Sequence, residues 1–496
     1  MKTIKALFFI FIVSCFLSAA SAENIPAEKS KSNEPVKSGQ KASSSPEAKK
    51  SPSGNFDVML LIDSSGSMRK TDPQDYRKAA ARLFISLMGT DDRVGVVSFG
   101  DTAKTLIPPT QNTAKNRQKL FDAVNKISSK EFSTHIQDGV KKGYEEIKAS
   151  TAAGKVLILM SDGKLTLGSK EKEDAAHAEL SRLLPELPKS GIKLYSVAFT
   201  EMSDAKLLES MARETGGFFK LASTDKDLHV MFTSIFEKIK SPDTVPLEDN
   251  TFGIDKDIQE VILVISKKPG TSTVIVDPSN KKHTPAQYAK NMQWYGSKIF
   301  DMITIKEPAV GKWKVNLSTR EGNKVFVITN LSLKSSFDKG FVNKGDKLKI
   351  DAWLEKDGGP LKEKDVLKQI TFFAEITGPD GKTGRLNLTD SGDGKYVGEL
   401  SAGVTGDYTL KIAAEGKTFK REKNFQFKAV EQPAGQKASA TGPAIKKPPV
   451  QGKISWADIL VQFGIINLAL LGVVAVVYIA RKIKQKSKTK VKKKRK

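Results

Sequence analysis

Residues 58–67 read Val-Met-Leu-Leu-Ile-Asp-Ser-Ser-Gly-Ser, and this stretch decides the fold. Five consecutive apolar residues are typical of a strand that is buried on both faces of a parallel sheet. Gly66 permits a tight turn after the strand, and Asp63 with two serine hydroxyls offers the hard oxygen ligands that Mg²⁺ accepts. Asp and Ser before a helix are also favoured as N-caps, for reasons unrelated to metals. The stretch therefore predicts a strand-to-helix turn that either caps a helix or holds a divalent ion.

Around this stretch, residues 55–241 alternate apolar runs with segments of helical periodicity. The alternation predicts a doubly wound α/β domain with a mostly parallel sheet. The predicted strands are 58–62, 94–99, 156–160 and 194–199, and the predicted helices are 76–88, 116–127, 136–147, 172–184, 204–213 and 225–239.

Ligands of an open α/β sheet lie beyond the carboxyl ends of its strands, so partners of Asp63 are expected on other loops at that edge. Two later segments fit this requirement. Thr134 places a hydroxyl immediately before a predicted helix, and Asp162 places a carboxylate directly after a predicted buried strand. These positions favour the metal interpretation of the first loop over a simple helix cap.

The whole of 55–241 resembles the von Willebrand factor type A family. The metal-ion-dependent adhesion site of that family has an Asp-x-Ser-x-Ser loop, a later Thr and a still later Asp. In the same order, this chain has Asp63, Ser65, Ser67, Thr134 and Asp162, which we call the five-residue site.

The resemblance implies that the five-residue site holds Mg²⁺, with Mn²⁺ or Ca²⁺ as alternatives. It implies that Ser65, Ser67 and sometimes Thr134 bind the ion directly, while Asp63 and Asp162 act largely through water. It also implies that an Asp or Glu of a protein partner fills the open coordination position. We therefore predict a binding protein and no enzymatic activity.

Two alternatives remain beside this interpretation. One is a mainly structural envelope-assembly component whose metal site is secondary. The other is a Mg²⁺-dependent phosphohydrolase similar to the haloacid dehalogenases, which also place Asp at the end of a first strand. That family needs a second Asp two residues later, where this chain has Ser65. We expect His135 to be structural or exposed, and Asp91, Asp92 and Asp101 to be solvated turn residues.

Residues 244–430 change to alternating apolar residues with frequent turns, which predicts β-structure. A weak repeat of about 100 residues relates Val274–Pro278 to Ala374–Pro379 and Gly311–Trp313 to Gly406–Tyr408, a spacing usual for β-sandwiches. We predict two immunoglobulin-like β-sandwich domains, at 244–333 and 334–430.

The remaining segments indicate where the protein works. Residues 1–22 are typical of a secretory signal peptide, and the single cysteine, Cys15, lies within it. Lipidation of Cys15 is an alternative to cleavage after Ala22. Polar composition predicts a disordered segment at 23–54 and a flexible linker at 431–455, and residues 459–480 are predicted to form a transmembrane helix.

The net charge of +25 is concentrated partly at the carboxyl end. Residues 481–496 carry eleven Lys or Arg and no acid, and subtracting them from +25 leaves +14 over the rest of the chain. A basic tail after a transmembrane helix is a topology signal, so we expect it in the cytoplasm and the folded domains outside, in the periplasm or at the cell surface. The partners expected are a protein ligand and an envelope complex, and no nucleic acid.

Overall fold

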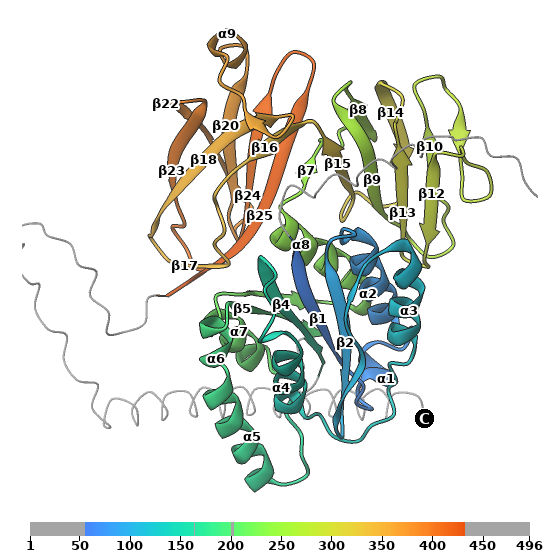
Figure 1. Cartoon of the computed structure of the whole chain (residues 1–496), viewed down its shortest axis with the longest axis vertical. Helices are drawn as coiled ribbons and strands as arrows, with labels where there is room; N and C mark the ends of the chain where they lie inside the picture. The colour runs from blue at the N-terminus through green and yellow to red at the C-terminus, as the bar shows by residue number, and fades with distance from the viewer. Residues whose placement is uncertain (1–54, 163, 200–202, 432–496) are drawn as a thin grey trace, which may run out of the picture. The chain divides into compact units, whose positions relative to one another are not determined.

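The computed structural model of the chain describes residues 55–162, 164–199 and 203–431 (Figure 1). The predicted signal peptide, the disordered segment, the linker after Glu431, the transmembrane helix and the basic tail lie outside these residues. Within the described ranges, no helix is long and apolar enough to cross a membrane.

Residues 55–241, here called the α/β region, form a six-stranded sheet in which only the edge strand β3 is antiparallel to its neighbour. The prediction of a mostly parallel sheet is confirmed. The strands in spatial order are β3 (Ala103–Gln111), β2 (Arg93–Phe99), β1 (Phe56–Asp63), β4 (Gly154–Ser161), β5 (Ile192–Phe199) and β6 (Phe218–Ala222).

Helices cover both faces of this sheet (Figure 1). Alternate residues of β1 face opposite cores, because side chains along a strand point to opposite faces. The helices are α1 (Met68–Thr71), α2 (Tyr76–Leu87), α3 (Ala114–Asn125), α4 (Ile136–Ile147), α5 (Lys170–Leu183), α6 (Glu186–Lys189), α7 (Ala205–Glu214) and α8 (Leu228–Lys240), with the 3₁₀ turn η1 (Asp225–Asp227) before α8. Val58, Leu60 and Ile62 pack with α2, α3 and α8, whereas Met59 and Leu61 pack with α4, α5 and α7.

Residues 242–431, here called the β region, contain three sheets. One sheet consists of β11 (Lys282–His283), β10 (Val274–Val276), β14 (Gly311–Asn316) and β8 (Thr251–Ile254). The largest runs through β12 (Met292–Gly296), β13 (Phe300–Lys306), β9 (Ile258–Ser266), β15 (Lys324–Thr329), β7 (Asp243–Thr244), β25 (Lys420–Val430), β24 (Gly406–Glu415), β20 (Thr371–Thr377) and β21 (Thr383–Asn387), with β17 (Phe341–Asn343) on β25. The third consists of β16 (Leu331–Lys334), β18 (Lys347–Lys356), β23 (Lys395–Ser401) and β22 (Thr389–Gly392), with β19 (Gly359–Pro360) on β18 and the short helix α9 (Lys364–Leu367) beside it.

The β region has two separate hydrophobic cores. One lies between the four-stranded sheet and the β9 end of the largest sheet, and the other lies between the β18 sheet and the β25 end. The two-residue strand β7 pairs with both β15 and β25 and so joins both halves into one sheet. The structure is therefore rich in strands, as predicted, while the immunoglobulin-like assignment stays a prediction.

The internal repeat has a structural counterpart at two glycines. Gly311 and Gly406 both have positive φ angles, of 134° and 133°, which favour glycine because a side chain there is strained. A Cβ on Gly311 would lie 3.0 Å from Pro278, and one on Gly406 would lie 2.7 Å from Pro379. The two proline turns and the two strands β14 and β24 therefore meet in the same way in each half.

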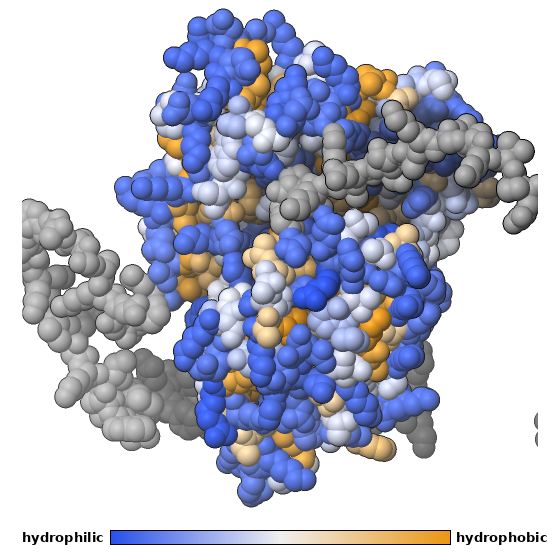
Figure 2. Space-filling model, viewed as in Figure 1, coloured by the Kyte–Doolittle hydropathy of each residue, from blue (hydrophilic) through white to orange (hydrophobic). Residues whose placement is uncertain are grey.

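Helix α8 packs on the β region as well as on its own sheet. The core around α2 and α8 includes Val264, Phe300 and Phe326 of the β region. The ring centroids of Phe236 and Phe326 are 5.3 Å apart, and the two rings meet edge to face. The face of the molecule that Figure 2 shows is mostly hydrophilic, with small separate apolar groups. The α/β and β regions thus share buried apolar surface.

Candidate metal centre

The five-residue site begins where two neighbouring parallel strands end. β1 ends at Asp63 and β4 ends at Ser161, and the two strands are in register, with Ile62 opposite Met160. Because the parallel strands β1 and β4 end at the same edge of the sheet, Asp162, which directly follows β4, lies next to Asp63. The topology therefore brings the two carboxylates together from positions almost one hundred residues apart in the sequence.

Asp63 is fully buried and its carboxylate accepts two hydrogen bonds. The Ser65 amide donates to Oδ1 at 2.7 Å, and the Ser161 hydroxyl donates to Oδ2 at 2.6 Å. The first contact closes the tight turn that the sequence predicts. Ser161 is a residue whose role the sequence pattern does not reveal, because its position at the end of a buried strand is common to many structural serines.

A chain of hydrogen bonds joins the other residues of the first loop to Asp162. The hydroxyls of Ser65 and Ser67 lie 2.9 Å apart, and the Ser67 hydroxyl donates to Asp162 Oδ1 at 2.8 Å. The hydroxyl of Thr71 donates to Asp162 Oδ2. Thr71 was not expected at the site, although it lies four residues after Ser67 on the short helix α1, at the spacing that places two side chains on one helical face.

Thr134 lies on a neighbouring loop that runs beside the first one. Its side chain is buried, and its amide donates to the Thr166 carbonyl at 3.1 Å. Glu131, three residues earlier, pairs with Ser65 through an isolated parallel bridge. The structure therefore places Thr134 beside the first loop, but no hydrogen bond joins its hydroxyl to the other four residues within the described part of the chain.

The electrostatics of the site favour a cation. Burial raises the pKa of Asp63 to about 6, and the Asp162 carboxylate adds to the rise, while hydrogen bonds from Ser161 and Ser65 act in the opposite direction. Neither Asp63 nor Asp162 forms an ion pair with any residue of the described ranges. A buried carboxylate without a counter-charge is costly, and a cation would remove that cost.

The donor set consists of carboxylates and hydroxyls, which are the hard oxygen ligands of Mg²⁺ and Ca²⁺. Among the described residues, no group of three or more His, Cys, Asp and Glu side chains could hold a metal by itself. A metal at this edge would therefore need the hydroxyls of Ser65, Ser67 and Thr134 in addition to the two acids. The residues present fit a hard divalent ion and do not fit a zinc site built from His and Cys.

Asp92 and Asp101, which were both expected to be solvated turn residues, lie in different environments. The expectation that Asp92 is solvated is wrong: it is fully buried, accepts from the amides of Phe56 and Gly89 at 2.9 and 2.8 Å, and lies 3.0 Å from Lys240 Nζ. It immediately precedes β2, at the opposite end of the strand from the five-residue site. A buried carboxylate is stable there because amide donors and a lysine compensate it.

Asp101 is exposed, as expected, but it organises the loop that carries Thr134. Its Oδ1 accepts from the amides of Phe132 and Ser133 at 3.0 and 2.8 Å. The backbone hydrogen bond from Ser133 is the leading cause that lowers the pKa of Asp101. His135 is partly exposed and lies 3.1 Å from Gln137 through its Nδ1, which agrees with the structural role that was expected.

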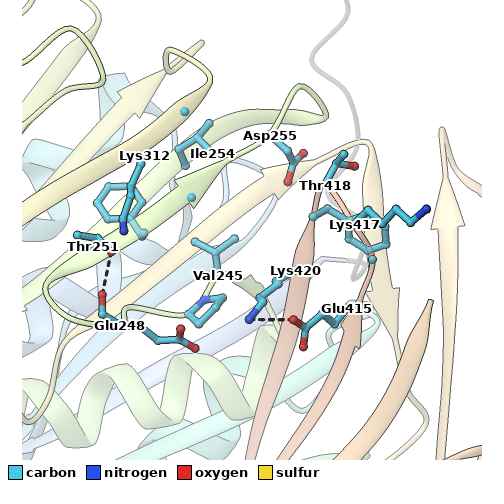
Figure 3. Close-up of a pocket in the computed structure, with 16 residues that line it drawn as sticks. Val245, Glu248, Thr251, Ile254, Asp255, Lys312, Glu415, Lys417, Thr418 and Lys420 are labelled. Carbon is cyan, nitrogen blue, oxygen red and sulfur yellow. Dashed lines mark hydrogen bonds and ion pairs between the residues drawn. The ribbon is translucent and has the colours of Figure 1, made fainter. Parts of the chain in front are cut away.

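A second candidate site is a cleft of about 460 Å³ between the edge strand β8 and the turn that joins β24 to β25 (Figure 3). Its charged lining residues are of both signs, and Glu415 and Lys420 form an ion pair at 3.0 Å. Figure 3 shows Lys417 at the outer side of the turn and Lys312 on the facing strand. A mixed lining does not select one sign of ligand charge, so the cleft is a weaker candidate than the five-residue site.

Comparisons with known proteins agree with the architecture of the α/β region. The sequence model of the von Willebrand factor type A domain matches residues 57–235. A "UPF0353 protein" of Mycolicibacterium vanbaalenii is 26% identical over 211 residues, which cover 37% of this chain and 60% of that protein. The chain thus spans 60% of the length of this relative.

The chain is also similar to a mouse protein in sequence and to a solved bacterial structure. The calcium-activated chloride channel regulator 3A-1 of Mus musculus is 27% identical over 262 residues, which cover 47% of this chain and 26% of that protein. The solved structure of a von Willebrand factor type A protein from Catenulispora acidiphila is 16% identical, with a TM-score of 0.33, and the match covers 62% of this chain and 64% of that one.

Proposed function

Because residues 57–235 form a von Willebrand factor type A domain, we propose that the protein is a membrane-anchored binding protein that uses a divalent-metal adhesion site. The five-residue site is the proposed metal centre, and an acidic side chain of a protein partner is the proposed ligand. The proposed location is the cell membrane, with the α/β and β regions outside the cytoplasm. The proposed activity is binding, without chemical conversion of the partner.

One observation carries this proposal. Asp63 and Asp162 are buried carboxylates at one sheet edge, linked through the amide of Ser65 and the hydroxyls of Ser65 and Ser67, and no described residue neutralises either of them. A bound Mg²⁺ would supply the missing positive charge together with a coordination position that a carboxylate can take. Asp63 would hold the first loop through the Ser65 amide, and Asp162 would orient the Ser67 hydroxyl.

The charge around the site supports an acidic partner. Arg69 and Lys70 follow the first loop, Lys130 lies beside Glu131, and Lys164 lies two residues after Asp162. All four side chains are exposed, and none forms an ion pair within the described ranges. Positive charges at the rim of an interface attract an acidic surface and raise its rate of association.

Metal binding and partner binding are tested separately. Isothermal titration of the full-length chain with Mg²⁺ is expected to give one site in the wild type and none in Asp63→Ala. Crosslinked pull-downs in Mg²⁺ and in EDTA then compare the same two proteins. Asp174→Ala removes an exposed carboxylate of α5 that forms no hydrogen bond or ion pair within the described ranges, and serves as the matched control. Equal recovery of partners by wild type and Asp63→Ala, with and without EDTA, would contradict the proposal.

The alternative function is a structural component of an envelope assembly in which the metal site is secondary. The shared core of α8 and the β region favours it, because a rigid multi-part unit suits a scaffold. Sensitivity of the assembly to EDTA distinguishes the two functions. A Mg²⁺-dependent phosphohydrolase would need a carboxylate at position 65, where the side chain is the hydroxyl of Ser65.

A further inference from the structure

Phe132 is the most exposed large hydrophobic residue in the described ranges. Its side chain is 93% exposed, whereas the next most exposed, Val310, reaches 61%. An isolated apolar residue on a surface is normal, but an aromatic ring with almost no protein contact contributes little to folding. Phe132 lies two residues before Thr134, so the exposed ring is on a loop of the five-residue site.

The backbone under Phe132 is fixed at every amide from residue 131 to residue 135. The amide of Glu131 donates to the Ser64 carbonyl at 3.2 Å, and those of Phe132 and Ser133 donate to Asp101 Oδ1. Thr134 and His135 donate to the carbonyls of Thr166 and Gly100 at 3.1 and 3.0 Å, respectively. The exposed ring therefore stands on an ordered loop, and little backbone freedom is left to lose on binding.

The same loop is joined directly to the five-residue site. Glu131 pairs with Ser65, and the Gly66 amide donates to the Glu131 carbonyl at 2.7 Å. The loop that carries Phe132 is thus hydrogen-bonded to the first loop of the proposed metal centre. The exposed basic residues on and next to these loops, Arg69, Lys70, Lys130 and Lys164, outnumber the exposed acid Asp101, so the rim combines one aromatic side chain with net positive charge.

We propose that Phe132 is an apolar anchor for an acidic protein partner that carries a large apolar side chain next to its metal-binding Asp or Glu. This inference rests on the proposed function, because the acidic residue would bind at the five-residue site. Aromatic residues held on rigid backbone are typical of binding hot spots, since they bury a large area at a small cost in conformational entropy. Phe132 would determine which acidic segments bind, and the metal centre would require that they be acidic.

The test uses a library of random linear peptides selected on the immobilised full-length chain in Mg²⁺ and eluted with EDTA. Four proteins are compared: wild type, Phe132→Ala, Asp63→Ala and the control Val310→Ala, which removes an exposed apolar side chain of the β region. Wild type and control are expected to select peptides in which an acidic residue has a large apolar neighbour at a fixed spacing. Phe132→Ala is expected to keep the acidic residue, lose the apolar preference and bind the wild-type peptides roughly tenfold more weakly.

Each result distinguishes this inference from the function on which it rests. Loss of EDTA-eluted binding in Asp63→Ala, together with unchanged peptide preference in Phe132→Ala, would keep the proposed function and overturn the role of Phe132. Absence of EDTA-eluted peptides from the wild type would overturn both. Metal affinity and melting temperature of Phe132→Ala are expected to equal those of the wild type, because the side chain makes no buried contact.

A membrane surface is the competing use of an exposed phenylalanine among basic residues. Sedimentation with vesicles of anionic phospholipid, with and without Mg²⁺, measures it. Metal-independent binding of the wild type to the vesicles that is lost in Phe132→Ala would overturn the protein-anchor role. Equal sedimentation of the two proteins, combined with the altered peptide preference of Phe132→Ala, would support it.

Discussion

Ser67 donates a hydrogen bond of 2.8 Å to Asp162, which lies ninety-five residues further along the chain. The contact joins the loops after β1 and β4, and it exists only when these two strands lie side by side. Folding of the sheet and assembly of the five-residue site are therefore one event. Any ion that binds there would bind the folded state alone and would stabilise it by mass action.

Asp63→Asn is expected to stabilise the metal-free protein at neutral pH and to remove its stabilisation by Mg²⁺. The pKa of about 6 lies above the ordinary value of 3.8, so this group contributes full stability below about pH 4 and loses it as pH rises through 6. The shift of about two pKa units corresponds to about 3 kcal/mol at pH 7. Asparagine keeps the acceptor for the Ser65 amide without the buried charge.

Thermal unfolding in EDTA at pH 5 and pH 7.5 measures this effect for wild type and mutant. The advantage of Asp63→Asn is expected to be larger at pH 7.5 than at pH 5. A mutant that is less stable than the wild type at both pH values would refute the electrostatic explanation. Asp174→Asn, on the exposed face of α5, controls for the loss of one negative charge.

Arg77→Met is expected to lower the free energy of unfolding by about 3 to 5 kcal/mol. Arg77 and Asp72 are both buried, with 2.7 Å between Nη1 and Oδ2, and Arg77 Nη2 also donates to the Ser128 carbonyl and the Ser129 hydroxyl. Removal of the guanidinium leaves Asp72 as a buried charge without its main partner. Urea unfolding measures the loss, and the double change Asp72→Asn with Arg77→Met is expected to recover part of it.

Phe326→Ala is expected to destabilise the α/β and β regions together, by about 3 to 5 kcal/mol. Phe326 lies on β15 but packs in the core of α8, against Phe236. Calorimetry of the full-length chain is expected to show one transition for both regions, shifted to lower temperature in the mutant. Two transitions, of which only one shifts, would contradict a shared core. Val397→Ala, which removes an exposed apolar side chain of β23, is the control.

The contact between His229 and Ser266 is expected to weaken in acid. His229 Nε2 lies 2.7 Å from the Ser266 hydroxyl, Nδ1 lies 2.8 Å from the Lys226 carbonyl, and the ring stacks on Phe300. Burial lowers the pKa of His229, while the Lys226 carbonyl and Asp227 oppose that effect. The stability that the neutral ring provides is therefore complete above its ordinary pKa of about 6.5 and is lost as pH falls through the lowered value.

Urea unfolding of wild type and His229→Gln at pH 7.5 and pH 5 checks this expectation. The wild type should lose more stability than the mutant over this interval, because only the wild type must protonate a buried ring. An equal loss in the two proteins would show that His229 does not titrate on unfolding. Ser266→Ala keeps the titrating ring and serves as a second comparison.

The fold of the α/β region could be predicted because its strands are continuous apolar runs and its helices have clear periodicity. The helix at 136–147 was predicted with its observed bounds, whereas β3 was missed. β3 contains Pro108 and Pro109 and pairs with β2 through register shifts, so it lacks the alternation that marks a strand. Its edge position tolerates both prolines.

The five residues selected from the sequence stay a predicted metal site, and their individual environments could not be predicted. Order along the chain and the ends of strands were enough to select Asp63 and Asp162. The contact of Thr71 with Asp162 and the burial of Asp92 depend on which loops the folded sheet brings together. The exposure of Phe132 was equally hidden, because a phenylalanine between polar residues in a loop is more often part of a core.

The two-residue strand β7 has a mechanical consequence. Through Thr244 it is paired with Phe326 of β15 on one side and Glu422 of β25 on the other, and β25 is itself paired with β24 over ten residues. Tension applied along β25 from residue 431 would act along the strand. It would therefore shear the hydrogen-bonded pairs of β25 all at once, instead of breaking them one after another. A force on the carboxyl end would then be transmitted through the sheet to β15, and from Phe326 to helix α8 on the sheet that carries the five-residue site.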